Sequence, residues 1–249
     1  MNGISFLENL FRETFFFREL FYEPLLNGLI WLYETVAIQD LGLAIILLTI
    51  AVRLLIYPLF HQGIKYQKVI QDLRPELNKI KDKHKNNKEA QTKATLELFK
   101  THKLNPLAPF LSLIVQLPVF LALYVIFVGD FTRTIEPWLY SFTPRPGELH
   151  LTFFGLINLT QASPVVAVLA ALSQYFQARL AFTAGTTPAM RVVMLYFLPG
   201  LILTALFKFP AAVGLYWLTT TVFSIIQQII VNRRSAIIPP SKPEGAVRA

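Results

Sequence analysis

The chain has 249 residues, of which 54% are apolar and only 15% are charged. This composition, with several apolar runs of membrane length, excludes a soluble globular domain and predicts an all-α integral membrane protein. Cysteine is absent, which excludes disulfides, thiolate metal sites and cysteine nucleophiles. The net charge of +8 favours a topology signal and an attraction to anionic lipids, so we expect no specific nucleic acid partner.

Residues 1–40 precede the first long apolar run and mix charged residues with Phe and Leu. They lack the basic stretch and the clean apolar core of a cleaved signal peptide. The spacing of their apolar residues predicts an N-terminal amphipathic segment that lies in the membrane interface. Ordinary helices that pack on the membrane bundle are the alternative.

The first predicted span comprises residues 41–60, LGLAIILLTIAVRLLIYPLF, and contains Arg53. A helix of this length rises about 30 Å, which is the thickness of the hydrocarbon core. A central arginine costs about 2.5 to 3.5 kcal/mol, whereas each Leu, Ile, Val or Phe returns about 0.3 to 0.6 kcal/mol, so the span inserts with its charge. A charge at that depth predicts a functional site. The alternatives are an arginine that extends to the interface and one that pairs with a carboxylate for packing alone.

The next segment, residues 61–106, is polar and basic, with eleven Lys or Arg and five Asp or Glu. Two apolar stripes predict two helices here, with Pro75 opening one helical piece and Asn86-Asn87 forming the turn between the helices. We interpret the segment as a cytoplasmic helical hairpin. Its charges either form a solvated face or dock a partner.

Four more apolar segments predict four more transmembrane helices, five in all. These spans are residues 107–128, 163–182, 192–207 and 211–231. The remaining segments are the loops 129–162 and 183–191 and a basic tail at 232–249, which we expect to be disordered. The segments on one side of the five predicted spans hold seventeen Lys or Arg, and the segments on the other side hold five. The positive-inside rule therefore predicts an external N-terminus, an extracytoplasmic loop at 129–162, and a cytoplasmic hairpin, second loop and tail.

Polar side chains within the predicted spans supply the candidate site. Thr49 lies one turn before Arg53 on the same helix face. Further candidates in the later spans are Gln116, Ser173, Gln174, Gln177, Tyr216, Trp217, Thr220, Ser224 and Gln227. The spans contain no Asp or Glu, and the four histidines lie outside them without metal-ligand spacing, so we expect no enzyme active site, metal or cofactor. Because a buried guanidinium without a counter-charge is costly, we expect Arg53 to lie in a water-filled groove.

Four stretches of the sequence resemble the YidC/Oxa1/Alb3 family of membrane protein insertases. They are TIAVRLLIYPL at 49–59, LRPEL at 73–77, HKLNPLAPFLSLIVQLPVFLALY at 102–124 and FPAAVGLYWLTTTVFSIIQQIIVNR at 209–233. Their order and spacing are those of the family, and the resemblance covers roughly residues 22–234.

The resemblance implies a five-span bundle around a hydrophilic groove that is closed on the outer side and open to the cytoplasm and to lipid, with the hairpin over its mouth. By the same resemblance, Arg53 matches the groove arginine and Thr49 the polar residue one turn before it, and Gln177 and Trp217 match groove-lining positions. We expect no counterpart of the large extracytoplasmic domain of Gram-negative members, because only residues 1–40 precede the first span. A lipobox cysteine and an organelle transit peptide are absent as well.

The function that the resemblance implies is the non-enzymatic insertion and chaperoning of new membrane proteins in the bacterial plasma (inner) membrane. Arg53 would attract acidic residues of a substrate's translocated tail into the groove. Nascent membrane proteins are then the partners, and the Sec translocon, the ribosome and anionic lipids are further candidates. The alternatives are a small anion transporter or channel, with Arg53 as its selectivity charge, and a purely structural assembly subunit.

Overall fold

The computed structural model describes residues 17–58, 69, 72–102, 108–128, 135–181 and 191–237. The described part is mostly helical, as predicted. In chain order its elements are the π-helix η1 (Arg18–Tyr22), α3 (Glu23–Thr35), α4 (Leu41–Leu55), α6 (Arg74–Lys83), α7 (Lys88–Thr101), α8 (Ala108–Val128), the 3-10 helix η2 (Glu136–Trp138), β1 (Thr152–Phe153), β2 (Ile157–Asn158), α10 (Pro164–Ala181), the π-helix η3 (Val193–Phe197), α12 (Leu198–Leu206) and α13 (Ala211–Ile237).

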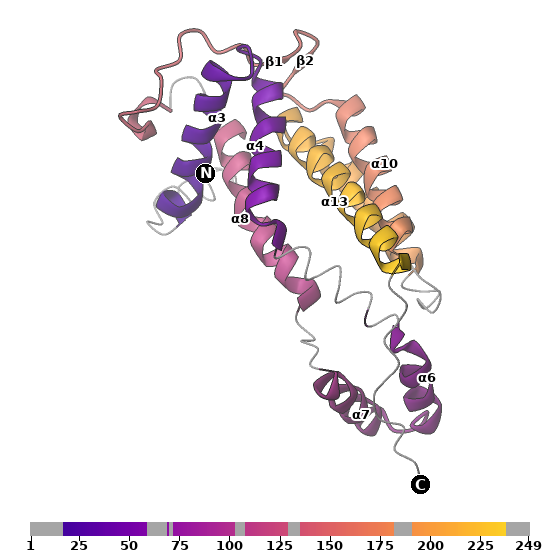
Figure 1. Ribbon diagram of the computed structural model, residues 1–249. Coiled ribbons are helices and arrows are strands. Elements are labelled where there is room, and N and C mark those ends of the chain that lie inside the picture. The colour runs from indigo at the N-terminus through magenta and orange to yellow at the C-terminus, as the bar shows by residue number, and fades with distance from the viewer. Residues whose placement is uncertain are drawn as a thin grey trace, which may run out of the picture.

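The long apolar helices form a bundle in which α13 has a central place (Figure 1). It packs against α10 on one side and α4 on the other, and it also contacts α8, while α3 covers α4 and α12 lies against α10. Gly214 permits the close crossing of α13 with α10, because a Cβ there would lie 2.8 Å from Cγ1 of Val166. Small residues at helix contacts are typical of membrane bundles, where close backbone approach replaces the hydrophobic driving force.

Helix α3 contributes a fully buried face to the main core. Leu26, Leu29, Ile30 and Tyr33 are all completely buried, and they cluster with residues of α4 and α8. Pro24 lies in the first turn of α3, where its missing N–H removes no helical hydrogen bond. The interfacial location of the N-terminal segment stays a prediction, while its described part from residue 17 onward packs on the bundle as the alternative interpretation describes.

A connection with little regular structure, which includes β1 and β2, crosses one end of the bundle. The two strands pair antiparallel, with Phe153 opposite Ile157. Asn27 of α3 anchors the connection: its Oδ1 accepts hydrogen bonds from Tyr140 N and Thr143 Oγ1, both at 2.7 Å. The sequence analysis did not predict this small sheet, because the two-residue strands are too short for a periodic signal.

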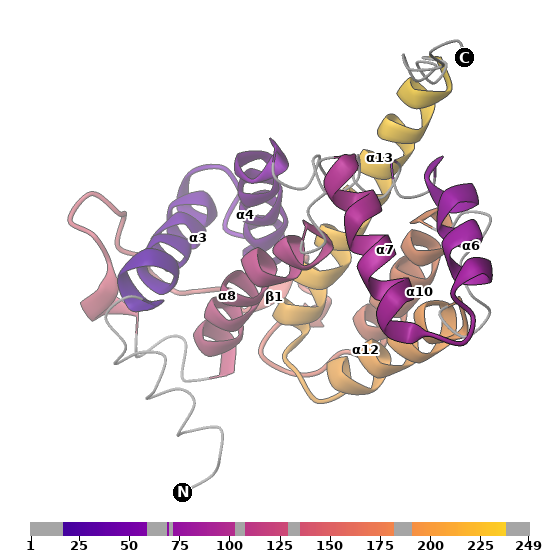
Figure 2. The same ribbon diagram turned by 90° about the horizontal axis from the view of Figure 1, so that it is seen from below.

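The helices α6 and α7 pack on each other as a hairpin at the opposite end of the bundle from β1 and β2 (Figure 1). Figure 2 shows them from below, in front of α10 and α12. Asn87, at the predicted turn, caps α7 by accepting a hydrogen bond from Ala90 N at 3.0 Å. Pro75 lies in the first turn of α6, which matches its predicted place at the start of a helical piece.

One helix of the described chain, at Ala211–Ile230, is long and apolar enough to cross a membrane by its length and composition. Shorter apolar helical stretches comprise Leu41–Leu55, Gln116–Val128 and Val193–Leu206. The regular part of α4 thus ends five residues before the predicted limit of the first span, with a turn at Ile56. Tyr57 and Pro58 are helical again after this turn, so the turn at Ile56 interrupts the helix locally.

Candidate functional site

Arg53 links α4 to α13. It lies in the last turn of α4 and is only 5% exposed. Its Nη2 donates hydrogen bonds to the backbone oxygen of Thr220, at 3.0 Å, and to Ser224 Oγ, at 2.8 Å. Hydrogen bonds with one ionised partner are stronger than those between neutral groups, so these two bonds hold the helices together at this level.

The guanidinium is covered by α13, which presents oxygen atoms to the charge. The water-filled groove that we expected around Arg53 stays a prediction. Ser224 Oγ also donates to the Thr220 oxygen at 3.0 Å, so a hydroxyl and a carbonyl one turn apart form a single network with Arg53. A buried charge that receives hydrogen bonds loses much less free energy than one left without them.

Thr49 is buried one turn before Arg53, as its sequence spacing indicated. Its Oγ1 donates to the backbone oxygen of Ile45 at 2.6 Å, which is a bond within α4 itself. Such a bond to the carbonyl four residues earlier occupies the hydroxyl proton and leaves the oxygen lone pairs available. Thr49 therefore offers the site an acceptor.

A row of polar residues on α13 faces α4 and α8. We call it the polar face, and it consists of Tyr216, Thr220, Ser224 and Gln227. The spacing of four, four and three residues places them on one side of the helix. The Tyr216 hydroxyl accepts a hydrogen bond from Gln116 Nε2 of α8, so three helices contribute to this region.

Two polar atoms of the polar face have no hydrogen-bond partner among the described residues. They are Gln227 Nε2 and Thr220 Oγ1, and both are buried. A buried polar atom without a partner carries a desolvation penalty unless water or another polar group reaches it. The polar face thus has capacity for additional hydrogen bonds beside Arg53.

Four further predicted site residues, Ser173, Gln174, Gln177 and Trp217, lie on α10 and α13. Trp217 Nε1 donates to Gln174 Oε1 at 3.3 Å, and the Trp217 ring meets Phe120 of α8 edge-on at a centroid distance of 5.8 Å. Gln177 is half-buried one turn after Gln174 on α10. Gln174 thus bonds α10 to α13, whereas Gln116 and Arg53 bond α8 and α4 to the same helix.

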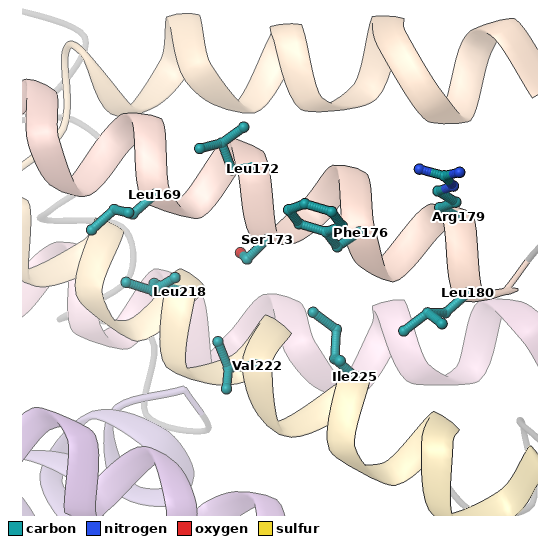
Figure 3. Close-up of a pocket in the computed structure, with 9 residues that line it drawn as sticks. All are labelled: Leu169, Leu172, Ser173, Phe176, Arg179, Leu180, Leu218, Val222 and Ile225. Atoms are coloured by element: carbon teal, nitrogen blue, oxygen red, sulfur yellow. The ribbon is translucent and has the colours of Figure 1, made fainter. Parts of the chain in front are cut away.

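An apolar groove of about 830 Å³ runs between α10 and α13 (Figure 3). Its lining consists of Leu169, Leu172, Ser173, Phe176, Arg179 and Leu180 of α10 and Leu218, Val222 and Ile225 of α13. Apart from Ser173, these residues were absent from the sequence-based candidates. Their spacing of three or four residues was a usable signal, but α10 and α13 are apolar around most of their circumference, so no single stripe stood out.

Metal binding has no support in the described part of the chain, where no group of three or more His, Asp or Glu could hold an ion.

Comparisons with known proteins agree with the resemblance noted in the sequence. Residues 31–237 match the family model described as 60Kd inner membrane protein. The "Membrane protein insertase YidC" of Geobacter metallireducens is 32% identical over 217 residues, which cover 86% of this chain and 37% of that protein. The protein of the same name from an Anaeromyxobacter species is 34% identical over 215 residues, which cover 85% of this chain and 36% of that protein. This chain thus spans little more than a third of the length of these relatives.

A solved structure is similar as well. It is a crystal structure of an active YidC insertase with its first transmembrane domain resolved. The match has a TM-score of 0.58 at 25% sequence identity and covers 86% of this chain and 46% of that chain. Nothing in these comparisons supports the alternative of an anion transporter or channel. The family model covers most of the chain, including every candidate site residue from Thr49 to Gln227, and the chain therefore belongs to the 60Kd inner membrane protein family.

Proposed function

We propose that this protein is a non-enzymatic insertase and chaperone for newly made membrane proteins in a bacterial plasma (inner) membrane. The observation that carries the proposal is the buried guanidinium of Arg53, bonded to Thr220 and Ser224 of another helix. None of α4, α8, α10, α12 and α13 contains an Asp or Glu, so these helices offer no carboxylate to Arg53. Such a site favours a substrate that brings its own negative charge.

In this proposal the polar face binds the hydrophilic tail of the substrate. A carboxylate that reaches Arg53 replaces a neutral hydroxyl and a carbonyl by an ionised acceptor, and bonds between two charged groups are stronger. Gln227 Nε2 and Thr220 Oγ1 supply further hydrogen bonds to the tail. The exchange requires α4 and α13 to separate at Arg53.

In this proposal the apolar groove binds the hydrophobic part of the substrate. Its Leu, Phe, Val and Ile side chains offer an apolar wall along α10 and α13, with polar groups only at Ser173 and Arg179. An apolar helix that leaves the protein along this wall enters lipid without crossing a polar region. The membrane potential, worth about 2.3 kcal/mol per charge per 100 mV, would help to draw an acidic tail outward.

The membrane arrangement is part of the proposal. We infer five spans, at α4, α8, α10, η3 with α12, and α13, with the N-terminus outside and the α6–α7 hairpin and the C-terminal tail cytoplasmic. The split of seventeen to five Lys or Arg across the flanks supports this orientation. The segment 61–106, which contains the hairpin, holds eleven of these seventeen residues, so we propose it as the docking region for substrates, with the ribosome, the Sec translocon and anionic lipids as candidate partners.

Single cysteines test the orientation, because the chain has no cysteine of its own. We expect cysteines at Lys85, in the hairpin, and at Arg145, in the connection before β1, to react with an impermeant maleimide from opposite sides of sealed membranes. A doubly substituted chain labelled at both positions from one side would contradict the five-span arrangement.

Insertion into proteoliposomes tests the function. The purified chain alone should increase the protease-protected fraction of a single-span protein with an acidic N-terminal tail severalfold over empty liposomes. The same vesicles, loaded with a chloride-sensitive dye, measure anion flux. If the chain gave no gain in protection but conducted chloride, and Arg53→Ala abolished that flux, the protein would be an anion channel and not an insertase.

A further inference from the structure

Two turns at one end of α4 expose large apolar side chains. We call them the apolar turn pair: residues 36–39, which precede α4, and residues 154–156, which connect β1 to β2. Ile38 is 80% exposed, Phe154 is 60% exposed and Leu156 is 86% exposed. Figure 1 shows β1 and β2 beside the same end of α4. These side chains contribute little to the core, so packing within the chain does not account for them.

The backbone of both turns is held in an uncommon conformation. Ile38 has a φ of 47° and Phe154 a φ of 47°, in the left-handed region that glycine and asparagine normally occupy. A β-branched or bulky residue there is strained, and strain of this kind persists only when neighbouring contacts maintain it. The strain indicates that the exposed apolar side chains have a use at these positions.

Asp40 supplies the contacts that maintain the turns. Its Oδ1 accepts from Leu43 N at 2.7 Å, which caps α4, and its Oδ2 accepts from Phe154 N at 2.5 Å. Gly42 adds a second connection, because the Phe153 ring occupies the space that a Cβ at Gly42 would need. The apolar turn pair is therefore a built surface fixed to the first turn of α4, in contrast to a loose loop.

The position and chemistry of the apolar turn pair match the boundary layer of a bilayer. Residues 36–39 end just before Leu41, where the apolar helix begins, so they lie at the level at which a span leaves the hydrocarbon. Residues 151–178 contain no charged residue and no histidine, and Asp40, the charged residue between the first turn and α4, is buried. Val165 and Val168, in the first turns of α10, are exposed apolar side chains as well.

We propose that the apolar turn pair inserts into the interfacial layer of the phospholipid bilayer and fixes the depth of α4. The apolar area of Ile38, Phe154 and Leu156 leaves water on insertion, and the strained turns keep these side chains directed outward. Since Arg53 belongs to the same helix, the anchor also sets the depth of the guanidinium. The proposal rests on the membrane location in the proposed function and is independent of insertase activity.

Depth-resolved quenching tests this anchor. Single cysteines at Ile38 and Leu156 are labelled with the fluorophore NBD in the otherwise cysteine-free, full-length chain. The references are Leu172→Cys, exposed on α10, and Gly147→Cys, exposed in the connection before β1. The vesicles contain phosphatidylcholine and phosphatidylglycerol, with bromine placed on shallow or deep acyl carbons. Thermal melting of each variant checks that the bundle is folded.

We expect shallow bromine to quench NBD at Ile38 and Leu156 at least twofold more than deep bromine does. Iodide, added in the water phase as a second quencher, should quench NBD at both positions less than at Gly147. The anchor is refuted if Leu172 is quenched by bromine while both turn positions behave like Gly147. Protection from iodide without quenching by bromine would also refute it, because a protein or a second copy then covers the turns. Absence of quenching at Leu172 would instead remove the membrane location on which the proposal rests.

Discussion

The polar face and the groove-lining side of α13 belong to one helix but have opposite chemistry. On one side Tyr216, Thr220, Ser224 and Gln227 form the polar face, where Thr220 and Ser224 accept hydrogen bonds from Arg53, and on the other Leu218, Val222 and Ile225 line the apolar groove. An α-helix with its side chains is only about 10 to 12 Å across. The comparison teaches that α13 alone can separate the ionic part of a substrate from its apolar part over the width of one helix.

The largest expected effect is at Arg53, beside the polar face of α13. Arg53→Ala should lower the insertion of a substrate with an acidic tail about tenfold or more, since a hydrogen bond to a charged group is worth about 1.5 to 3 kcal/mol. A neutral-tailed version of the same substrate should lose much less. Paired insertion assays in proteoliposomes measure both.

Arg53→Lys is the matched control for this change. An ammonium attracts carboxylates at the same place without bidentate geometry, so the variant should keep much of the activity. The melting temperature of Arg53→Ala in detergent should change little, because its lost hydrogen bonds are offset by the removal of a buried charge. Equal loss on both tails, with a lowered melting temperature, would make Arg53 a structural residue and end its assignment to tail binding.

An intermediate effect is expected on the apolar side. Phe176 is half-exposed in the apolar groove, so Phe176→Ser should remove roughly 1 kcal/mol of apolar contact with a substrate helix, or about fivefold in insertion. The loss should be the same for acidic and neutral tails. Phe176→Leu, which keeps an apolar side chain, should stay near the unmodified level. If the Ser variant impaired only acidic tails, the two sides of α13 would not act separately.

The smallest effect should come from removing the Ser224 hydroxyl, which accepts a hydrogen bond from Arg53 beside the Thr220 carbonyl. Ser224→Ala removes one of the two acceptors but leaves the charge that attracts the tail, so acidic-tail insertion should change only about two- to threefold, which corresponds to roughly 0.5 kcal/mol. Thr219→Ala is the control, because Thr219 Oγ1 donates to Leu215 O within α13 itself. A change in Thr219→Ala as large as that in Ser224→Ala would assign the effect to α13 as a helix and not to its polar face.

Much of this architecture was predictable from periodicity and turn chemistry. The apolar run with a single arginine, the basic segment with Pro75 and Asn87, and the tightly spaced last two apolar segments correspond to α4, to α6 with α7, and to α12 with α13. These features depend on residues close in sequence. The family also followed from motifs whose order and spacing are visible without a structure, and the family comparison confirmed it.

The partners of the site residues depended on the tertiary structure. Sequence spacing placed Arg53 beside Thr49, yet its recorded hydrogen bonds reach residues 167 and 171 positions later in the chain. The pairing of Gln116 with Tyr216 and of Gln174 with Trp217 likewise follows from how α8 and α10 pack on α13. A backbone carbonyl such as that of Thr220 carries no sequence signal, because every residue has one.

The sequence by itself determined that the chain is an apolar, helical member of its family with one arginine in an apolar helix, since composition and local periodicity reflect the burial that each residue requires. Only the tertiary structure decided that α13 covers this arginine, that an apolar groove runs along the other side of the same helix, and that Asp40 joins two strained turns. These features arise from contacts between residues far apart in the chain, and their geometry depends on how whole helices pack.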